Sequence, residues 1–432
     1  MRLFPERRTH AGANVIGGEK MDFTSKPFGR REALREPCVI ATYEAQMPDS
    51  GTMLERAGRF AVGQTVGTWV PVPGITQEMI DRYQGQVLSV YETGSTPDGA
   101  GCILRVAFPT ANFGGSLTQL MTALVGNDVS TSLRTRLIDL ELTGGAAFSS
   151  AKQGLSSLRE LTGAFDRPLV LNMLKPCAGY TPEKGAQMFR EVALGGVDLV
   201  KDDELLGSTV YNAVAQRTRL YVRVSDEVFE ETGKRTLYVP NISGSPKQMR
   251  EHVRAVIDEG AKACLVNFVF GGLDALAELN EEFGDRIFLL AHYAGLSVMT
   301  SGIANGVYLG LLARLAGAHG VMTMCPNPNN AAEMLDFCKT VQMQKLDIPG
   351  LAPTLTAVGG GITPINQAWL QKLLGKDMIL GIGGAIQGHP MGTTQGALAA
   401  MTAVRATAAG IELDAAAEAC PALRRCLQLW NQ

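Results

Sequence analysis

The stretch that decides the fold reads GGVDLVKDDELLGS and runs from Gly195 to Ser208. Its two glycines signal a turn, and the apolar segment Val197–Val200 predicts a short buried strand. Lys201 closes that strand, and three acids follow it directly: Asp202, Asp203 and Glu204. Acids favour the beginning of a helix, so capping would account for them. Capping leaves the lysine unexplained, because a cation is poorly placed at a helix N-terminus.

A divalent cation accounts for the whole group. Mg²⁺ prefers hard oxygen ligands and keeps several waters, and the acids after Lys201 would supply such ligands. Lys201 must then be neutral or become an anion. Addition of carbon dioxide to its neutral amine would give a carbamate, which is a third oxygen ligand. The stretch therefore predicts a Mg²⁺ site formed by Lys201 and the acids that follow it, with helix capping as the alternative.

Further apolar runs follow in a regular series after Leu155, with helical stretches such as TPEKGAQMFREVALGG and MREHVRAVIDEGA between them. Strands alternating with helices in this way predict an α/β domain of the (β/α)8 barrel type. A doubly wound sheet is the alternative, but its glycine-rich turn after the first strand is missing. The expected strands are Leu169–Leu174, Val197–Val200, Thr236–Val239, Ala263–Val269, Ile287–Leu290, Gly320–Met324, Leu351–Val358 and Met378–Ile382.

The chain upstream of this series has a mixed pattern. CVIATYEAQ and GCILRVAFPTANF are typical of strands, whereas SLTQLMTALVGN is typical of an amphipathic helix. We therefore expect an N-terminal extension at 1–36, an α+β domain at 37–150 and a catalytic barrel domain at 151–432. Either Met1 or Met21 serves as the start.

Composition narrows the class of protein. The chain has 432 residues, 46% of them hydrophobic and 19% charged, with a formal net charge of −3. This balance argues against nucleic acid or an anionic membrane as a partner. Eight cysteines without a CxxC pair favour reduced thiols in a cytoplasmic protein. No apolar segment approaches the ~20 residues that a membrane helix needs.

Polar residues at the ends of the expected strands extend the candidate site, because barrel enzymes work at the C-terminal ends of their strands. Lys175 follows the first strand, where a lysine is costly unless paired or used for proton transfer; a side chain snorkelling to the surface is the alternative. His292 follows the fifth strand and could equally be a core histidine. Two glycine clusters, at 359–361 and 383–384, predict a phosphate site, with plain turns as the alternative.

The sequence also resembles a known family. GGVDLVKDDE resembles the metal-site motif of ribulose-bisphosphate carboxylase/oxygenase (RuBisCO), and KPCAGY, GTWVPVPG, NFGGSLTQLMTALVGN and GGAIQGHPMG resemble other motifs of that family in the right order. The resemblance runs from about residue 37 to residue 415. It implies a ferredoxin-like N-terminal domain before the barrel, and a homodimer or a higher assembly of dimers.

The resemblance also implies roles for individual residues. Lys201 would be carbamylated and would bind Mg²⁺ with Asp203 and Glu204, while Lys175 would handle the proton that forms an enolate. His292 matches an active-site histidine, and Asn127 matches an asparagine contributed by the partner subunit. The residues that match the first phosphate site are Thr68, Trp69, Gly361, Gly383 and Gly384.

Several departures from the family pattern bear on activity. Cys177 replaces a second lysine, Gly63 or Gln64 replaces a glutamate, and the segment CPNPNNAAEM lacks the lysine expected over bound carbon dioxide. The arginine, histidine and serine of the second phosphate site fall on Tyr293, Met322 and Gly359. The resemblance is therefore to a RuBisCO-like protein (form IV) that acts on a monophosphate, rather than to a carbon-fixing carboxylase.

Three reactions fit the surviving residues: enolisation, isomerisation, and formation of the enolate by decarboxylation. Methionine-salvage enolases of the family carry a lysine base where this chain has Asn127, which argues against that activity. We favour a decarboxylase, or a transcarboxylase and hydrolase, of 3-oxo-isoapionate 4-phosphate, because this branched β-keto acid with one phosphate fits the surviving residues. The alternatives are a methylthioribulose-1-phosphate isomerase, a 2,3-diketo-5-methylthiopentyl-1-phosphate enolase and a non-catalytic binding protein.

Overall fold

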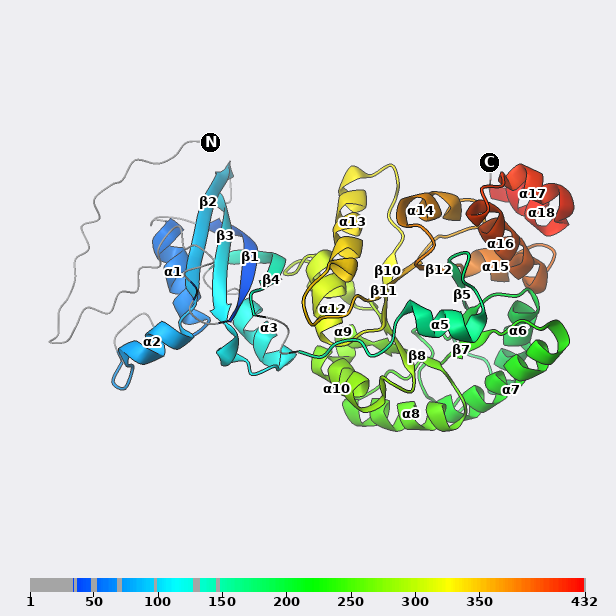
Figure 1. Cartoon of the computed structure of the whole chain (residues 1–432), viewed down its shortest axis with the longest axis horizontal. Helices are drawn as coiled ribbons and strands as arrows, with labels where there is room; N and C mark the ends of the chain where they lie inside the picture. The colour runs from blue at the N-terminus through cyan, green and yellow to red at the C-terminus, as the bar shows by residue number, and fades with distance from the viewer. Residues whose placement is uncertain are drawn as a thin grey trace.

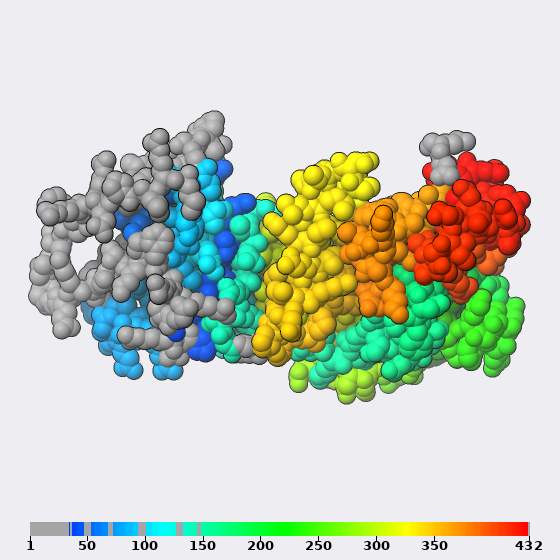
Figure 2. Space-filling model, turned by 45° about the horizontal axis from the view of Figure 1, so that its top comes forward, coloured from blue at the N-terminus to red at the C-terminus, as the bar shows by residue number. Residues whose placement is uncertain are grey.

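The chain folds into an N-terminal α+β part and a C-terminal barrel that lie end to end (Figure 1). The computed structural model describes residues 34, 37–47, 53–67, 72–96, 99–126, 133–144 and 148–430. Figure 2 shows the surface, with the yellow region around helix α13 (Ala331–Lys345) between the cyan N-terminal part and the orange part of the barrel.

The N-terminal part is a four-stranded antiparallel sheet with its helices on one face. Across the sheet the strand order is β2-β3-β1-β4, which is the ferredoxin-like arrangement expected above. Its elements are β1 (Cys38–Met47), α1 (Met53–Gly63), α2 (Gln77–Tyr83), β2 (Gln86–Thr96), β3 (Gly99–Pro109), the 3₁₀ turn η2 (Thr110–Asn112), α3 (Leu117–Val125) and β4 (Arg134–Leu142).

Alternation along β1 explains which face of this sheet is covered. Val39, Ala41 and Tyr43 point to one side and are fully buried in the core that the helices complete. The Tyr43 ring meets Phe60 of α1 edge to face, and its hydroxyl donates to the Leu124 carbonyl at 2.9 Å. Successive residues of a strand point to opposite faces, so the other face of β1 carries polar residues such as Glu44.

The C-terminal part is an eight-stranded parallel barrel, which confirms the predicted fold. Neighbouring strands follow the order β7-β6-β5-β12-β11-β10-β9-β8. The last gap, between β7 and β8, is closed only by a bridge between Asn241 and Leu265 and its adjoining backbone hydrogen bonds. The strands are β5 (Leu169–Met173), β6 (Leu199–Lys201), β7 (Leu237–Val239), β8 (Ala263–Asn267), β9 (Phe288–His292), β10 (Gly320–Met324), β11 (Leu355–Gly359) and β12 (Ile379–Gly381).

Helices surround the barrel, and several begin with the caps that their sequences predict. Thr181 caps α6 with Pro182 in its first turn, and Ser245 and Gln248 form a capping box at the start of α8. Within the described ranges, no helix is long and apolar enough to cross a membrane. The helices are α5 (Leu155–Thr162), α6 (Pro182–Leu194), α7 (Val214–Thr232), α8 (Pro246–Asp258), α9 (Phe268–Gly271), α10 (Leu273–Phe283), α11 (Leu296–Met299), the π-helix η3 (Gly306–Leu312), α12 (Ala313–Leu315), α13, α14 (Gln367–Leu374), α15 (Gly384–Gln387), α16 (Thr393–Ala408), α17 (Leu413–Ala419) and α18 (Pro421–Trp430).

All eight predicted strands are present, and the boundaries differ by a few residues. The largest difference is in the seventh strand, which was expected to begin at Leu351 and begins at Leu355. Pro353 lies in the missing part, and proline has no N–H to donate to a neighbouring strand. The fifth strand extends to His292, which places that side chain at the end of the strand itself.

One carboxylate joins the two parts of the chain. Asp274, in the first turn of α10, accepts hydrogen bonds from the Ser116 hydroxyl at 2.9 Å and from the backbone N–H groups of Leu117 and Thr118 at 2.8 and 3.0 Å. These N–H groups begin α3 and have no partner within their own helix. Although burial opposes it, these hydrogen bonds lower the pKa of Asp274, so a barrel residue caps an N-terminal helix as an anion.

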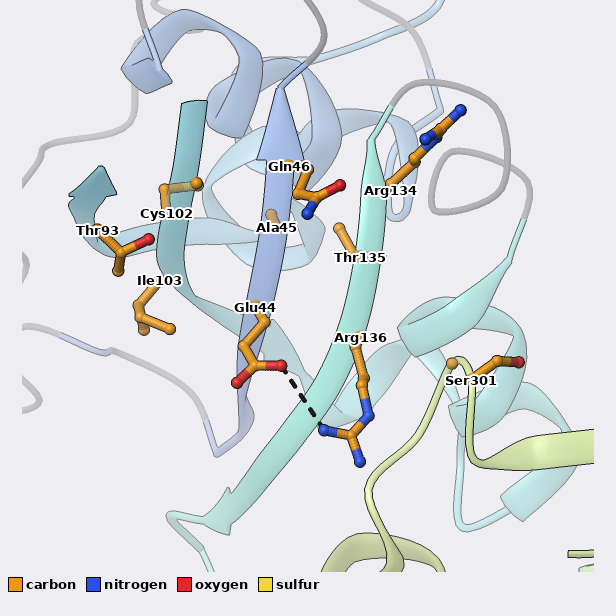
Figure 3. Close-up of a pocket in the computed structure, with 12 residues that line it drawn as sticks. Glu44, Ala45, Gln46, Thr93, Cys102, Ile103, Arg134, Thr135, Arg136 and Ser301 are labelled. Carbon is orange, nitrogen blue, oxygen red and sulfur yellow. Dashed lines mark ion pairs between the residues drawn. The ribbon is translucent and has the colours of Figure 1, made fainter. Parts of the chain in front are cut away.

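A hollow of about 730 Å³ lies on the polar face of the N-terminal sheet (Figure 3). Arg136 of β4 crosses it to pair with Glu44 of β1 at 3.6 Å, and its Nε donates to the Thr300 carbonyl of the barrel part at 3.2 Å. None of the described candidate site residues lines this hollow. It belongs to the junction between the two parts rather than to the barrel mouth.

His319 makes the stability of the barrel dependent on pH. It is fully buried just before β10, where Nδ1 accepts the Leu289 N–H at 3.0 Å and Nε2 lies 2.8 Å from Asn280 Oδ1. Burial, with a smaller contribution from Lys152, lowers the pKa of His319 to about 3. The unfolded chain therefore takes up this proton first as the pH falls below about 6.5.

We accordingly expect this contribution to stability to be complete above pH 6.5 and to fall at lower pH by up to about 1.4 kcal/mol per pH unit until the folded pKa is reached. Urea unfolding at pH 7.5, 6.5, 5.5 and 4.5 measures the slope. His319→Asn removes the titrating group and should flatten the slope by that amount. An unchanged slope in the variant would show that other groups carry the dependence.

Candidate active site at the barrel mouth

The described site residues gather where strands β5, β6 and β9 end. Lys201 is the last residue of β6 and His292 is the last residue of β9, while Lys175 lies two residues beyond the end of β5. Asp203 and Glu204 follow Lys201 on the irregular segment that leads to α7. Residues far apart in the sequence are thus brought to one end of the barrel, where barrel enzymes work.

Glu204 connects Lys201 to His292. The Lys201 Nζ is 3.2 Å from Glu204 Oε2 and donates to the Asp202 carbonyl at 2.9 Å. The same Glu204 oxygen lies 3.3 Å from His292 Nε2. Lys201 is almost fully buried, with 1% of its side chain exposed, whereas 30% of the Glu204 side chain is exposed to the mouth.

Lys175 contacts the other acid of the group. Its Nζ is 2.5 Å from Asp203 Oδ2 and 3.1 Å from Cys177 Sγ. Although burial opposes it, the hydrogen bond to Asp203 raises the pKa of Lys175. Burial likewise opposes ionisation of Asp203, and the same hydrogen bond lowers the pKa of that carboxyl. Lys175 keeps 40% of its side chain exposed, so its amine stands at the open side of the site.

Burial disfavours the charged forms of Lys201 and His292, the two innermost residues of the site. It lowers the pKa of Lys201, against the attraction of Glu204 and Asp203. Burial also lowers the pKa of His292 to about 4, with the nearby Lys201 acting in the same direction. His292 is therefore neutral near pH 7. Its Nδ1 accepts the Ala294 N–H at 3.1 Å, so the ring proton sits on Nε2 and faces Glu204.

These residues fit a hard divalent cation if Lys201 supplies an oxygen. Among the residues that the structure describes, no three His, Cys, Asp or Glu side chains are grouped to hold a metal ion. Asp203 and Glu204 offer two carboxylates, and a carbamate on Lys201 would offer a third oxygen ligand. The buried Lys201 amine, whose pKa is lowered, is suited to the carbon dioxide addition that makes a carbamate.

Asp202 takes no part in this donor set. It is fully buried, and its carboxylate accepts from Arg217 Nε at 2.9 Å, from the Tyr238 hydroxyl at 2.6 Å and from the Asn241 N–H at 2.9 Å. Three hydrogen bonds leave little of this carboxylate for a cation. The structure thus separates the three acids after Lys201 into one that is used internally and two that face the site.

The glycine clusters border open space at the same end of the barrel. Gly360 and Gly361 have φ values of +90° and +69°, a backbone conformation that side chains with a Cβ rarely adopt. A Cβ built on Gly361 or Gly384 would meet nothing within 4 Å, while one on Gly383 would lie 3.1 Å from Met173 Cε. The loops have room for a ligand, and phosphate binding by Gly361, Gly383 and Gly384 stays a prediction.

Three further predicted site residues, Thr68, Trp69 and Asn127, lie outside the described residues. Their roles in phosphate binding and in a partner's site therefore stay predictions as well.

The positions that depart from the bisphosphate pattern pack together as an apolar wall. Tyr293 stacks on His292 with 4.8 Å between ring centroids, and its hydroxyl lies 2.5 Å from Met324 Sδ. Met322 is buried inside the barrel, and a Cβ on Gly359 would lie 2.9 Å from its Cε. A serine at 359 would therefore displace Met322. Met324, which is 54% exposed, presents this wall to the mouth.

Sequence reasoning missed the residues behind the site: Arg217, Tyr238 and the bonding role of Asp202. A signal for Arg217 was present, because it shares the i, i+4, i+7 spacing of Tyr221 and Val224 on the buried face of α7. An arginine on such a face needs a buried acceptor. The pattern therefore required a carboxylate or carbonyl groups beneath the helix.

The fold and this cluster define a two-domain barrel protein with lysine and acid residues at its mouth. The family model described as the ribulose bisphosphate carboxylase large chain, catalytic domain, matches residues 154–430, and the model of the N-terminal domain matches residues 33–143. The chain therefore belongs to the RuBisCO large-chain family. Within that family it is a form IV RuBisCO-like protein.

Individual relatives show where in the family the chain lies. It is 33% identical over 392 residues to a ribulose bisphosphate carboxylase-like protein of Archaeoglobus fulgidus, covering 87% of this chain and 89% of that one. It is 32% identical over 407 residues to a 2,3-diketo-5-methylthiopentyl-1-phosphate enolase of Geobacillus thermodenitrificans, covering 91% and 98%.

Solved structures agree with these relatives. A RuBisCO-like protein of Alicyclobacillus acidocaldarius superimposes with a TM-score of 0.82 at 33% identity, covering 91% of this chain and all of that one. A dimeric archaeal RuBisCO of Hyperthermus butylicus gives the same TM-score at 28% identity, covering 91% and 96%.

Proposed function

We propose that this chain catalyses Mg²⁺-dependent enolisation of a keto compound that carries one phosphate and an apolar tail, with 2,3-diketo-5-methylthiopentyl-1-phosphate as the first candidate. The observation that carries this proposal is the apolar wall at the mouth, where Tyr293 contacts the exposed Met324 in front of the buried Met322. A methylthio tail can pack there, whereas a second phosphate would be left without a partner. Relatives named for this enolase support the same choice.

This proposal changes the order of candidates derived from the sequence. From the sequence, Asn127 in place of a lysine argued against the enolase, and a 3-oxo-isoapionate 4-phosphate decarboxylase came first. The named relatives cover 91% of the chain, and an apolar wall suits a thioether better than a hydroxylated sugar acid. The decarboxylase is retained as the second candidate, because Asn127 in place of the lysine base argues against the enolase.

Each residue of the site has a part in the proposed reaction. Lys201, as its carbamate, would hold Mg²⁺ with Asp203 and Glu204. The bound cation would supply positive charge that stabilises an enolate oxygen. The neutral His292 places its Nε2 3.3 Å from Glu204 Oε2 and would help to orient that carboxylate. The glycine loops would bind the phosphate through backbone N–H groups.

Lys175 would move the proton that is removed from carbon. Its amine is exposed to the mouth and adjacent to Asp203, so it can reach both a substrate and the metal ligands. A general base of this kind contributes about 10²–10⁴-fold to rate. The ion pair with Asp203 favours the protonated form of the Lys175 amine. Once the Asp203 carboxylate binds the metal instead, the amine would lose its proton more easily, so metal binding would prepare Lys175 to accept a proton from the substrate.

We further propose that the protein works as a homodimer or an assembly of dimers. The family resemblance implies that Asn127 of one subunit completes the site of another, and dimeric and octameric relatives support the proposal.

The test is a comparison of two substrates in Mg²⁺ and bicarbonate. We expect deuterium incorporation from solvent into 2,3-diketo-5-methylthiopentyl-1-phosphate, followed by proton NMR, and no carbon dioxide release from 3-oxo-isoapionate 4-phosphate. Met324→Lys places a cation in the apolar wall and should lower kcat/KM for the methylthio substrate by about tenfold or more.

Leu373→Lys is the matched control, since Leu373 is an exposed apolar residue on the outer helix α14 and its replacement should leave kcat/KM unchanged. Carbon dioxide release from the second compound without exchange on the first would replace the proposed function by the decarboxylase. Absence of both reactions would favour a binding protein.

A further inference from the structure

The two carboxylates of the metal site sit on a segment without regular structure. Residues 202–213, all of which are described, form neither helix nor strand between β6 and α7. Such a segment lacks the backbone ladder that holds ligands in place elsewhere in the barrel. Metal ligands nevertheless need fixed orientations, which their outer neighbours commonly supply. Buried side chains that hydrogen-bond to residues 202–213 are therefore needed to hold them in place.

Arg217 provides that support from the first turn of α7. Its side chain is fully buried, and its guanidinium donates to the carbonyls of Asn212 at 2.8 Å, Gly207 at 3.2 Å and Asn241 at 3.1 Å. The first two acceptors belong to the irregular segment and the third follows β7. The planar fork of arginine suits several acceptors at once.

Asp202 ties this support to Lys201. It lies between Lys201 and Asp203 in the chain, and its carboxylate is held by Arg217, by the Tyr238 hydroxyl and by the Asn241 N–H. The Asp202 carbonyl is also the acceptor for Lys201 Nζ at 2.9 Å. Asp202 thus supplies one of the two hydrogen-bond acceptors of the Lys201 amine, and Glu204 supplies the other.

Asn241 extends the same network to Glu204. Its side-chain Nδ2 donates to the Glu204 carbonyl and to the Leu206 carbonyl, both at 3.2 Å. Its own carbonyl accepts from Arg217 and its N–H donates to Asp202. Arg217 is thus linked to both ends of the segment that carries the ligands. Asp202 connects it to Lys201, and Asn241 connects it to Glu204.

We infer that Arg217, acting through Asp202 and Asn241, is a positioning residue that sets the geometry of the Lys201, Asp203 and Glu204 ligands. The inference rests on the metal site of the proposed function but not on the identity of the substrate. Stability alone does not account for the network, because a buried ion pair often contributes less than well-packed apolar residues would. Here the buried pair of Arg217 and Asp202 holds the irregular segment 202–213 in place.

The test measures Mn²⁺ affinity by titration calorimetry in bicarbonate buffer, alongside the melting temperature, in the full chain. Arg217→Lys keeps a positive charge beside Asp202 but loses the fork, and should weaken Mn²⁺ binding by about 10–100-fold. Its control is Arg314→Lys. Arg314 is equally buried and donates only to carbonyls distant from the site, those of Ala352, Met343, Leu346 and Leu351.

A milder pair covers the case in which Arg217→Lys fails to fold. Tyr238→Phe removes one hydrogen bond to Asp202 and should weaken Mn²⁺ binding several-fold. Tyr221→Phe is its control, because the Tyr221 ring lies 4.4 Å from that of Tyr238 and its hydroxyl is not among the partners of the Asp202 carboxylate. It should leave the affinity unchanged.

The outcomes separate this inference from the proposed function. Equal Mn²⁺ affinity in each variant and its control, with lowered melting temperatures, would overturn the positioning role and leave a structural one. A wild-type chain that binds Mn²⁺ but enolises neither substrate would sink the proposed function alone. A wild-type chain that binds no Mn²⁺ in bicarbonate would overturn both.

Discussion

Lys201→Met is expected to lower Mg²⁺-dependent turnover by about 10³-fold or more, because the site would lose the proposed carbamate oxygen that binds the metal. Methionine occupies a similar volume to lysine and cannot take up carbon dioxide. The buried position of Lys201, with 1% of its side chain exposed, makes an apolar replacement compatible with the fold. Mn²⁺ affinity in bicarbonate and the rate of deuterium exchange measure the effect.

The control is Lys152→Met. Lys152 lies next to His319 at the opposite end of the barrel strands, and its Nζ donates to the Glu281 carbonyl at 2.6 Å. Both variants should show the circular dichroism and the molecular mass of the wild type. Retention of full metal-dependent turnover by Lys201→Met would show that no carbamate is needed.

Lys175→Met is expected to slow proton exchange by about 10²–10⁴-fold while leaving the metal site able to bind. The variant removes the amine that would accept the proton, but none of the proposed metal ligands. It also removes the cation that now pairs with Asp203 at 2.5 Å. Mn²⁺ affinity should therefore stay at the wild-type value or rise, while exchange is lost.

Separating binding from exchange is the informative part of this experiment. Lys184→Met, an exposed lysine on α6, serves as the control and should change neither quantity. Loss of Mn²⁺ binding in Lys175→Met would give the lysine a structural role in the metal site. Undiminished exchange would remove it as the base.

The fold was predictable where buried strands appear in the sequence as regularly spaced apolar runs. The barrel strands are continuous apolar runs because both of their faces are covered, and each run stood out between helical stretches. Strands β2 and β4 of the N-terminal sheet were not identified. RTRLIDLEL in β4 alternates polar and apolar residues because one face of that sheet is polar, and QVLSVYETGST in β2 carries several polar residues.

The candidate site was predictable where its residues are neighbours in the chain and form a short motif. Lys201, Asp203 and Glu204 are adjacent in the chain, so a motif could name them, and the resemblance to RuBisCO added Lys175 and His292. The resemblance also left Asp202 out of the ligands, but the reason for this lies in the fold, because Tyr238 and Arg217 bind its carboxylate. The apolar wall likewise depends on contacts across β9, β10 and β11.

The weakly joined edge of the barrel has a consequence for its dynamics. Strands β7 and β8 meet through Asn241 and Leu265, and Asn241 also holds the Glu204 carbonyl. A local opening of this edge would therefore release the acid that faces the mouth, and a ligand that fastens Glu204 would slow the opening. The backbone amides of Ile242 and Leu265, which bond across the edge, become hydrogen-exchange reporters of occupancy at a site that neither of them touches.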